Sequence, residues 1–139
     1  MFEAELYKVL SSEKQIISLI QNYRGKPAIF AGGVPGDADL PYIAFDIAPS
    51  IAASPETMKF NIMIDYWERG QSRANAAQIA QLIENLLDMK ALESERYSCV
   101  RFFIFRSSFI PDPDPRVIHY NLQFTARAGR KTFINSLSN

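Results

Sequence analysis

The chain has 139 residues, 47% of them hydrophobic and 22% charged, which fits one globular domain and excludes an intrinsically disordered protein. Lysine plus arginine and aspartate plus glutamate both number 15, and this zero net charge argues against a simple nucleic-acid binder, which normally carries a basic excess. The single cysteine excludes an internal disulfide. The sequence starts without signal-peptide features, and no apolar run approaches the ~18 residues of a membrane span. We therefore expect a cytoplasmic protein without a membrane partner.

Charge is distributed unevenly along the chain. Residues 1–96 hold 9 basic and 13 acidic side chains, whereas residues 97–139 hold 6 basic and 2 acidic ones. Such an asymmetry suits head-to-tail contacts between copies, in which the basic side of one subunit meets the acidic side of the next. The alternative is that acidic and basic side chains from the two parts of the chain are interspersed on the folded surface. The sequence does not decide between these two arrangements.

Two helices are predicted at the start of the chain. Apolar residues there follow the i, i+4, i+7, i+8 spacing of a helix with one buried stripe: Phe2, Leu6, Val9 and Leu10. Ser12 with Gln15 has the pattern of a capping box, which predicts a second, short helix. The apolar side of this second helix holds Ile16, Ile17 and Ile20.

Strands and turns dominate the next part. Residues 28–31 form a short apolar piece, followed by a turn-rich loop over residues 32–41. Residues 42–47 alternate between apolar and polar, which predicts a half-buried strand. Residues 48–57 contain two prolines and predict a second loop. A long strand is expected over residues 57–67.

The second half of the chain predicts a helix and two more strands. Ser72 is a plausible N-cap for a helix that runs to Met89 with one apolar stripe. Tyr97 to Phe109 predicts a strand, and the proline-rich residues 111–115 stop it. Residues 117–127 alternate well and predict the last strand.

This order of elements predicts the fold class. Four main strands that each present one apolar face suit a two-layer α+β domain, with a mostly antiparallel sheet covered by the N-terminal helices and one central helix. We expect residues 1–128 to form this single domain and residues 129–139 to form a polar C-terminal tail.

No residue pattern indicates enzyme chemistry. The glycines of the 32–36 loop lack the Lys-Ser/Thr pair of a phosphate-binding loop. Cys99 and His119 are the single cysteine and histidine, which is too few for a zinc site. A Cys99–His119 dyad across the last hairpin stays open, but a buried Cys99 and a surface His119 are the expectation. We predict no catalytic, metal or cofactor-binding residue, and no cofactor.

Aromatic and charged residues indicate an interface instead. Arg101 and Arg106 are interleaved with Phe102, Phe103, Phe105 and Phe109 on one strand. This mixture is typical of single-strand nucleic-acid platforms or of a strand that contacts a neighbouring subunit. We favour the subunit contact, because the net charge is zero. Trp67 faces away from the apolar side of its strand, toward an interface or a second core. The residues expected at interfaces are Trp67, Phe103, Phe105, Asp112, Asp114, Arg116, Arg130 and Lys131.

Four segments in order resemble the tail completion proteins of tailed phages and prophages, a family that includes tail terminators and tail-to-head joining proteins. The segments, which span about residues 1–128, are the helical start that ends near Ile20, Ile29–Pro35 with Leu40–Ile43, Phe60–Trp67 with the helix Ser72–Leu87, and Tyr120–Phe124. Residues 48–57, residues 109–116 and the tail after Ala128 match no part of the family pattern.

The resemblance implies a structural role in the virion. Such proteins form rings, commonly hexamers, at the head-proximal end of the tail tube, after synthesis in the host cytoplasm. They contact the tail tube protein and the head completion or connector protein, and DNA passes through the lumen without sequence-specific contact. The alternatives are a small ligand-binding protein or enzyme on a ferredoxin-like sheet and a single-strand nucleic-acid binder.

Overall fold

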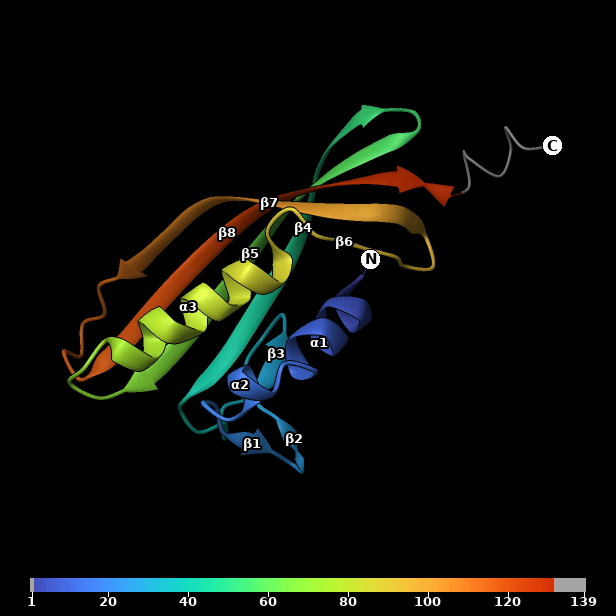
Figure 1. Cartoon of the computed structure of the whole chain (residues 1–139). Helices are drawn as coiled ribbons and strands as arrows, with labels where there is room; N and C mark the ends of the chain where they lie inside the picture. The colour runs from blue at the N-terminus through green and yellow to red at the C-terminus, as the bar shows by residue number, and fades with distance from the viewer. Residues whose placement is uncertain (1, 132–139) are drawn as a thin grey trace.

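The computed structural model describes residues 2–131, and of residues 49–53 it describes the backbone alone. In Figure 1, α3 lies along one face of a long twisted sheet, and α1 and α2 lie beside it near β3. The elements are α1 (Glu3–Ser11), α2 (Lys14–Ile17), β1 (Asn22–Tyr23), β2 (Lys26–Pro27), β3 (Ile29–Ala31), β4 (Tyr42–Ser54), β5 (Thr57–Arg69), α3 (Ala74–Leu87), β6 (Ala91–Leu92), β7 (Tyr97–Ile110) and β8 (Val117–Arg130).

The main sheet has six strands in the order β3-β4-β5-β8-β7-β6. Its neighbours pair antiparallel except for β3 and β4, which pair parallel, so the sheet is mixed. β1 and β2 form a separate two-stranded sheet. The predicted α+β class is confirmed. The predicted four strands are β4, β5, β7 and β8, and the short β3 and β6, which carry only two or three residues, extend the sheet beyond them.

Residues 48–57 form no loop, contrary to the prediction. β4 continues to Ser54 and β5 begins at Thr57, so a long hairpin turns at Pro55 and Glu56. The β4–β5 register shifts after Pro49. Because proline donates no backbone hydrogen bond, it is confined within sheets to edges, strand starts and bulges, and such a shift accommodates Pro49.

The core lies between the helices and one face of the sheet. In β5 the buried residues alternate at Phe60, Ile62, Ile64 and Tyr66, each 0% exposed, as a half-buried strand requires. α3 adds Ile79, Ile83 and Leu87, and α1 adds Leu6 and Leu10. Each fully buried side chain of this size stabilises the fold by roughly 1.5–3 kcal/mol. The core therefore fixes which sheet face points away from the helices.

Helix starts differ from the predicted caps. The carboxylate of Glu13, not the Ser12 hydroxyl, caps α2, and it accepts a 3.3 Å bond from the backbone N–H of Gln15. The Ser12 hydroxyl instead donates to the carbonyl of Lys8 at the end of α1. The hydroxyl of Ser72 accepts a 3.2 Å bond from the backbone N–H of Ala74, although Arg73 occupies the cap position of α3.

Among residues 2–131, no helix combines the length and the hydrophobicity that a bilayer crossing requires.

Candidate assembly interface

One face of the main sheet carries no helix, and we call it the open face. Its residues alternate along each strand with the buried residues of the core, and directly paired residues point to the same side. In the two central strands the open face consists of Lys59, Asn61, Met63, Asp65 and Trp67 of β5 and His119, Asn121, Gln123, Thr125 and Arg127 of β8.

A polar network on the open face is centred on Asp65. The carboxylate oxygen Oδ1 of Asp65 lies 2.7 Å from Nε2 of His119 and accepts a 2.8 Å bond from Nδ2 of Asn121. The side chain of Gln123 continues the network with a 2.9 Å bond to Oδ1 of Asn121. Asn121 is only 2% exposed. The network therefore holds β5 and β8 together by side-chain bonds in addition to their backbone ladder.

An aromatic row runs from this network toward β3. Trp67 stacks on the ring of His119, with centroids 4.3 Å apart and an interplanar angle of 17°. Tyr42 of β4 follows at 5.6 Å from Trp67, and Phe30 of β3 follows at 5.9 Å from Tyr42. Burial raises the pKa of the Tyr42 hydroxyl above its ordinary value. Contacts of this geometry contribute beyond area burial, so the row forms a firm, half-buried surface.

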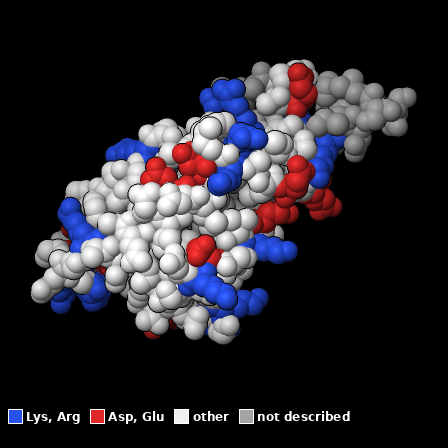
Figure 2. Space-filling view, in the orientation of Figure 1, with Lys and Arg blue, Asp and Glu red and all other residues white. Residues whose placement is uncertain are grey.

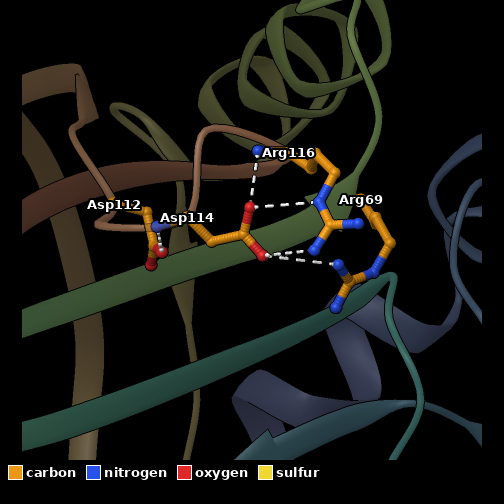
Figure 3. A network of polar contacts seen from close by, with 4 residues as sticks. All are labelled: Arg69, Asp112, Asp114 and Arg116. Carbon is orange, nitrogen blue, oxygen red and sulfur yellow. Dashed lines mark hydrogen bonds and ion pairs between the residues drawn. The ribbon is translucent and has the colours of Figure 1, made fainter.

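The proline link, residues 111–115, joins β7 to β8 at the end of this row. Asp112 accepts a 2.9 Å bond from the backbone N–H of Asp114, and Asp114 accepts one of the same length from the backbone N–H of Arg116. As Figure 3 shows, the carboxylate of Asp114 also lies between two guanidinium groups: 3.3 Å from Nε of Arg116 and 3.5 Å from Nη1 of Arg69. The link is therefore tied to the end of β5.

The electrostatics of Asp114 follow from these contacts. The backbone N–H of Arg116 is the largest cause that lowers the pKa of the Asp114 carboxyl, and the Arg116 side chain adds to it. Arg69 and the charge of Arg116 lower this pKa further. Asp114 therefore stays ionised at neutral pH and acts as an anchor, so it supplies no proton as a general acid would.

The other predicted interface residues lie far from the proline link. Phe103 is half-buried on the open face of β7, and Phe105 is 59% exposed at an irregularity in the β7–β8 register. Arg130 ends β8, with its backbone N–H donating to the carbonyl of Glu56 at 2.8 Å. Nζ of Lys131 lies 3.5 Å from the carboxylate of Glu93. The predicted residues are thus spread along the sheet: Arg130 and Lys131 lie at the end opposite the proline link, and Phe103 and Phe105 lie near the middle of β7. The tail residues 132–139 lie outside the described part.

The alternative Cys99–His119 dyad is wrong. Residue 98 pairs with residue 129 and residue 110 with residue 119, so about ten residues of β8, roughly 30 Å, separate the two side chains. Cys99 is exposed rather than buried, because it sits in a register shift of β7 with a φ of +52°. His119 is half-buried against Asp65 and Trp67 rather than solvated.

Sequence reasoning missed the outer surface of α3. All of its exposed residues are uncharged: Ala74, Asn75, Ala77, Gln78, Gln81 and Asn85. Figure 2 shows the area over α3 as largely uncharged, with the charged side chains around it. Depletion of charge, more than hydrophobicity, distinguishes the centre of a protein interface. The signal was present in the sequence, since Glu84 is the one charged residue between positions 74 and 87.

Among residues 2–131, no group of three His, Cys, Asp or Glu side chains is placed to hold a metal ion. Residues 4–129 match the tail completion protein gp17 family. A chain described as "Virion of native gene transfer agent (GTA) particle" has a similar fold, with a TM-score of 0.72 over 89% of this chain and 91% of that chain at 18% identity. A second solved structure has a TM-score of 0.59 over 94% of this chain and 97% of that chain at 11% identity. No curated protein matches the sequence.

The class is that of structural virion proteins of the tail. The chain belongs to the tail completion protein gp17 family, because the match covers most of its length. The resemblance derived from the four sequence segments is confirmed. The family is a structural one, so the prediction that this chain is not an enzyme is confirmed as well.

Proposed function

We propose that copies of this chain form a closed ring, commonly of six, at the head-proximal end of the tail tube, and that the ring docks the tube to the head connector. The observation that carries the proposal is the pair of unlike surfaces on opposite sides of the sheet: the open face and the outer surface of α3. Head-to-tail packing of identical subunits needs two different patches on each subunit, and a ring results when the rotation closes.

The outer surface of α3 supports one half of this contact. Its 14 residues span about 21 Å, and its exposed side chains are small or amide-bearing. Such side chains are buried at lower desolvation cost than charges. A neighbouring copy that packs on the outer surface of α3 therefore buries no exposed charged residue of this helix.

The proline link and the aromatic row support the docking part of the proposal. Both lie at one end of the sheet, and Asp112 and Val117 border clefts on both sides of the link. Because the link is tied to Arg69 and its prolines restrict the backbone, this end presents a pre-organised shape. This end of the sheet therefore loses little conformational entropy when a docking partner binds.

A charge insertion tests the ring. In the variant A77E/Q81E, two carboxylates enter the centre of the uncharged α3 surface, and we expect the assembly midpoint to rise at least tenfold in concentration. The matched control A4E/Q15E places the same substitutions on exposed positions of α1 and α2 and is expected to assemble like the wild type. Light scattering on a sizing column reads the mass, and thermal unfolding by circular dichroism checks that both variants fold. Wild-type assembly of A77E/Q81E would remove α3 from the interface.

A further inference from the structure

Three basic side chains form one row across the open face, and we call them the cation row: Lys59 of β5, Arg127 of β8 and Arg101 of β7. Lys59 pairs directly with Arg127, and Arg127 pairs directly with Arg101. Among the described side chains, no carboxylate lies within ion-pair distance of these three cations. Because like charges directly opposite each other destabilise a sheet, the row works against the stability of the free chain.

Two carboxylates at the C-terminal end of α3 lack a counter-charge as well. Glu84 lies in the last turn of the helix, which holds no basic residue, and Asp88 is the C-cap. Within residues 2–131, neither carboxylate has a lysine or arginine side chain within ion-pair distance. The negative end of the helix dipole repels a carboxylate, and like charges four residues apart repel each other. A cationic partner would therefore stabilise this end of α3.

The two charged groups lie at the same position along the strands, on opposite faces of the sheet. Asp88 forms a β-bridge with Phe102, the residue that follows Arg101. The Oδ1 oxygen of Asp88 also accepts a 2.9 Å bond from the backbone N–H of Ile104. Glu84 lies one helical turn earlier, since its carbonyl accepts a 2.8 Å bond from the backbone N–H of Asp88. The carboxylates are thus on the helix side where the cation row is on the open face.

The rest of the two surfaces matches in the same way. In Figure 1, α3 runs antiparallel to β5, so the N-terminal direction of the helix follows the C-terminal direction of the strand. At about 1.5 Å per residue, Gln81 and Ala77 lie about 5 and 10 Å from Glu84 along the helix. Two uncharged pairs on the open face lie about 7 and 13 Å from the cation row: Asn61 with Thr125 and Met63 with Gln123. Charged positions therefore correspond to charged ones, and uncharged positions to uncharged ones.

We propose that, in the ring, the cation row of one copy contacts Glu84 and Asp88 of the next copy. This inference rests on the proposed function and adds which charges pair between neighbours. A rotation about an axis along the strands carries each copy to the next without shifting it along that axis. The strands of every copy therefore run roughly along the ring axis. Complementary charges at the margin of the uncharged contact fix its register.

Charge reversal on each side in turn tests this contact. K59E/R127E gives the row a net negative charge. E84K/D88N makes the helix end positive, and the asparagine keeps an oxygen that can accept the bond from Ile104. Each variant alone sets like charges against each other in a head-to-tail ring, so we expect its assembly midpoint to rise at least about tenfold in concentration. Light scattering on a sizing column reads the mass under the condition in which the wild type assembles.

An equimolar mixture of the two variants is the decisive sample. In an alternating ring each reversed row meets a reversed helix end, and each native row meets a native helix end, so opposite charges face each other at every contact. We expect the mixture to assemble with a midpoint within about threefold of the wild-type value. The control K14E/K26E changes the net charge as much as K59E/R127E does, at exposed positions outside the contact, and should assemble like the wild type.

The outcomes separate this contact from the ring itself. Wild-type midpoints for both variants, or a mixture that assembles no better than its components, would overturn the contact and leave the ring in place. A wild type that stays monomeric, alone and with tail tube protein, would overturn both. Thermal melts check that the variants fold. Where a reversal unfolds the chain, the neutral variants K59Q/R127Q and E84Q/D88N replace it, and unchanged midpoints for these would also overturn the contact.

Discussion

Asp65 joins the two central strands through side chains as well as backbone. Its Oδ1 oxygen contacts both His119 and Asn121, which are neighbours on the same face of β8. The imidazole of His119 is thereby fixed between a carboxylate and the indole of Trp67. Polar groups this far from water must be paired, because an unpaired buried donor or acceptor costs about 1–3 kcal/mol.

Asn121 gives the sharpest test at this scale. Asn121→Ala removes the bond to Asp65 and leaves the amide of Gln123 without its acceptor, so we expect the free energy of unfolding to fall by about 1–3 kcal/mol. Urea unfolding followed by circular dichroism measures it. Asn61→Ala, an exposed asparagine on the same face, is the control and should change stability by less than about 0.5 kcal/mol. Equal effects of the two substitutions would contradict a structural role for the network.

The network shows what a strand pattern predicts and what it omits. Alternation placed His119 and Asn121 on the polar side of β8, which is correct. It gave no register between β5 and β8, so it could not bring Asp65 opposite Asn121, and a surface His119 was expected instead. The contacts of Asp65 with His119 and Asn121 join residues 54 and 56 positions apart, so the packing of the whole sheet decides them.

At the scale of elements, the proline link is rigid for two reasons. Three prolines restrict the backbone of residues 111–115, and Asp114 connects the link to Arg69 on a different strand. The prediction that the proline-rich residues 111–115 stop the preceding strand is correct, because β7 ends at Ile110. The contact with Arg69 lay beyond sequence reasoning, because it joins positions 45 apart in the chain.

The anchor has a defined pH dependence. Because the pKa of Asp114 is lowered in the folded chain from its ordinary 3.8, its contribution to stability is present above that value and is lost as the pH falls through the folded pKa. We expect the wild type to have a higher melting temperature than Asp114→Asn at pH 7. The two melting temperatures should converge below about pH 3.8. Calorimetry across this range measures the difference. A gap that stays constant from neutral to acidic pH would contradict the ion-pair anchor.

The β4–β5 hairpin shows where an element was missed. Two prolines and small residues over 48–57 favour a loop by composition. The hairpin forms nevertheless, because β4 and β5 pair from Tyr42–Trp67 to Ser54–Thr57, with register shifts after Pro49 and after Ala52. Tertiary pairing here overrides local propensity.

At the scale of the whole molecule, the acidic residues 1–96 and the basic residues 97–139 do not fold into two separate halves of opposite charge. β8, from the basic part of the chain, lies between β5, from the acidic part, and β7. The positive charge instead becomes concentrated locally, where Arg101 and Arg127 meet Lys59 across the sheet. Only the strand order, which composition does not contain, reveals this.

The larger part of the fold was predictable for a physical reason. Helix and strand periods in the core segments are enforced by burial, so the order of the long elements and most core residues follow from the pattern. The strand order, the register shifts around Cys99 and Phe105, and the uncharged outer surface of α3 as an interface needed the three-dimensional structure. Surface function is the least patterned property of a sequence that carries no catalytic motif.

The central proposal is that copies of this chain assemble into a ring. The most direct test is the mass of the wild-type protein by light scattering on a sizing column, alone and mixed with purified tail tube protein. We expect a ring-sized species in at least one case, about 95 kDa for six chains of 15.8 kDa. A strict 15.8 kDa monomer under both conditions would contradict it.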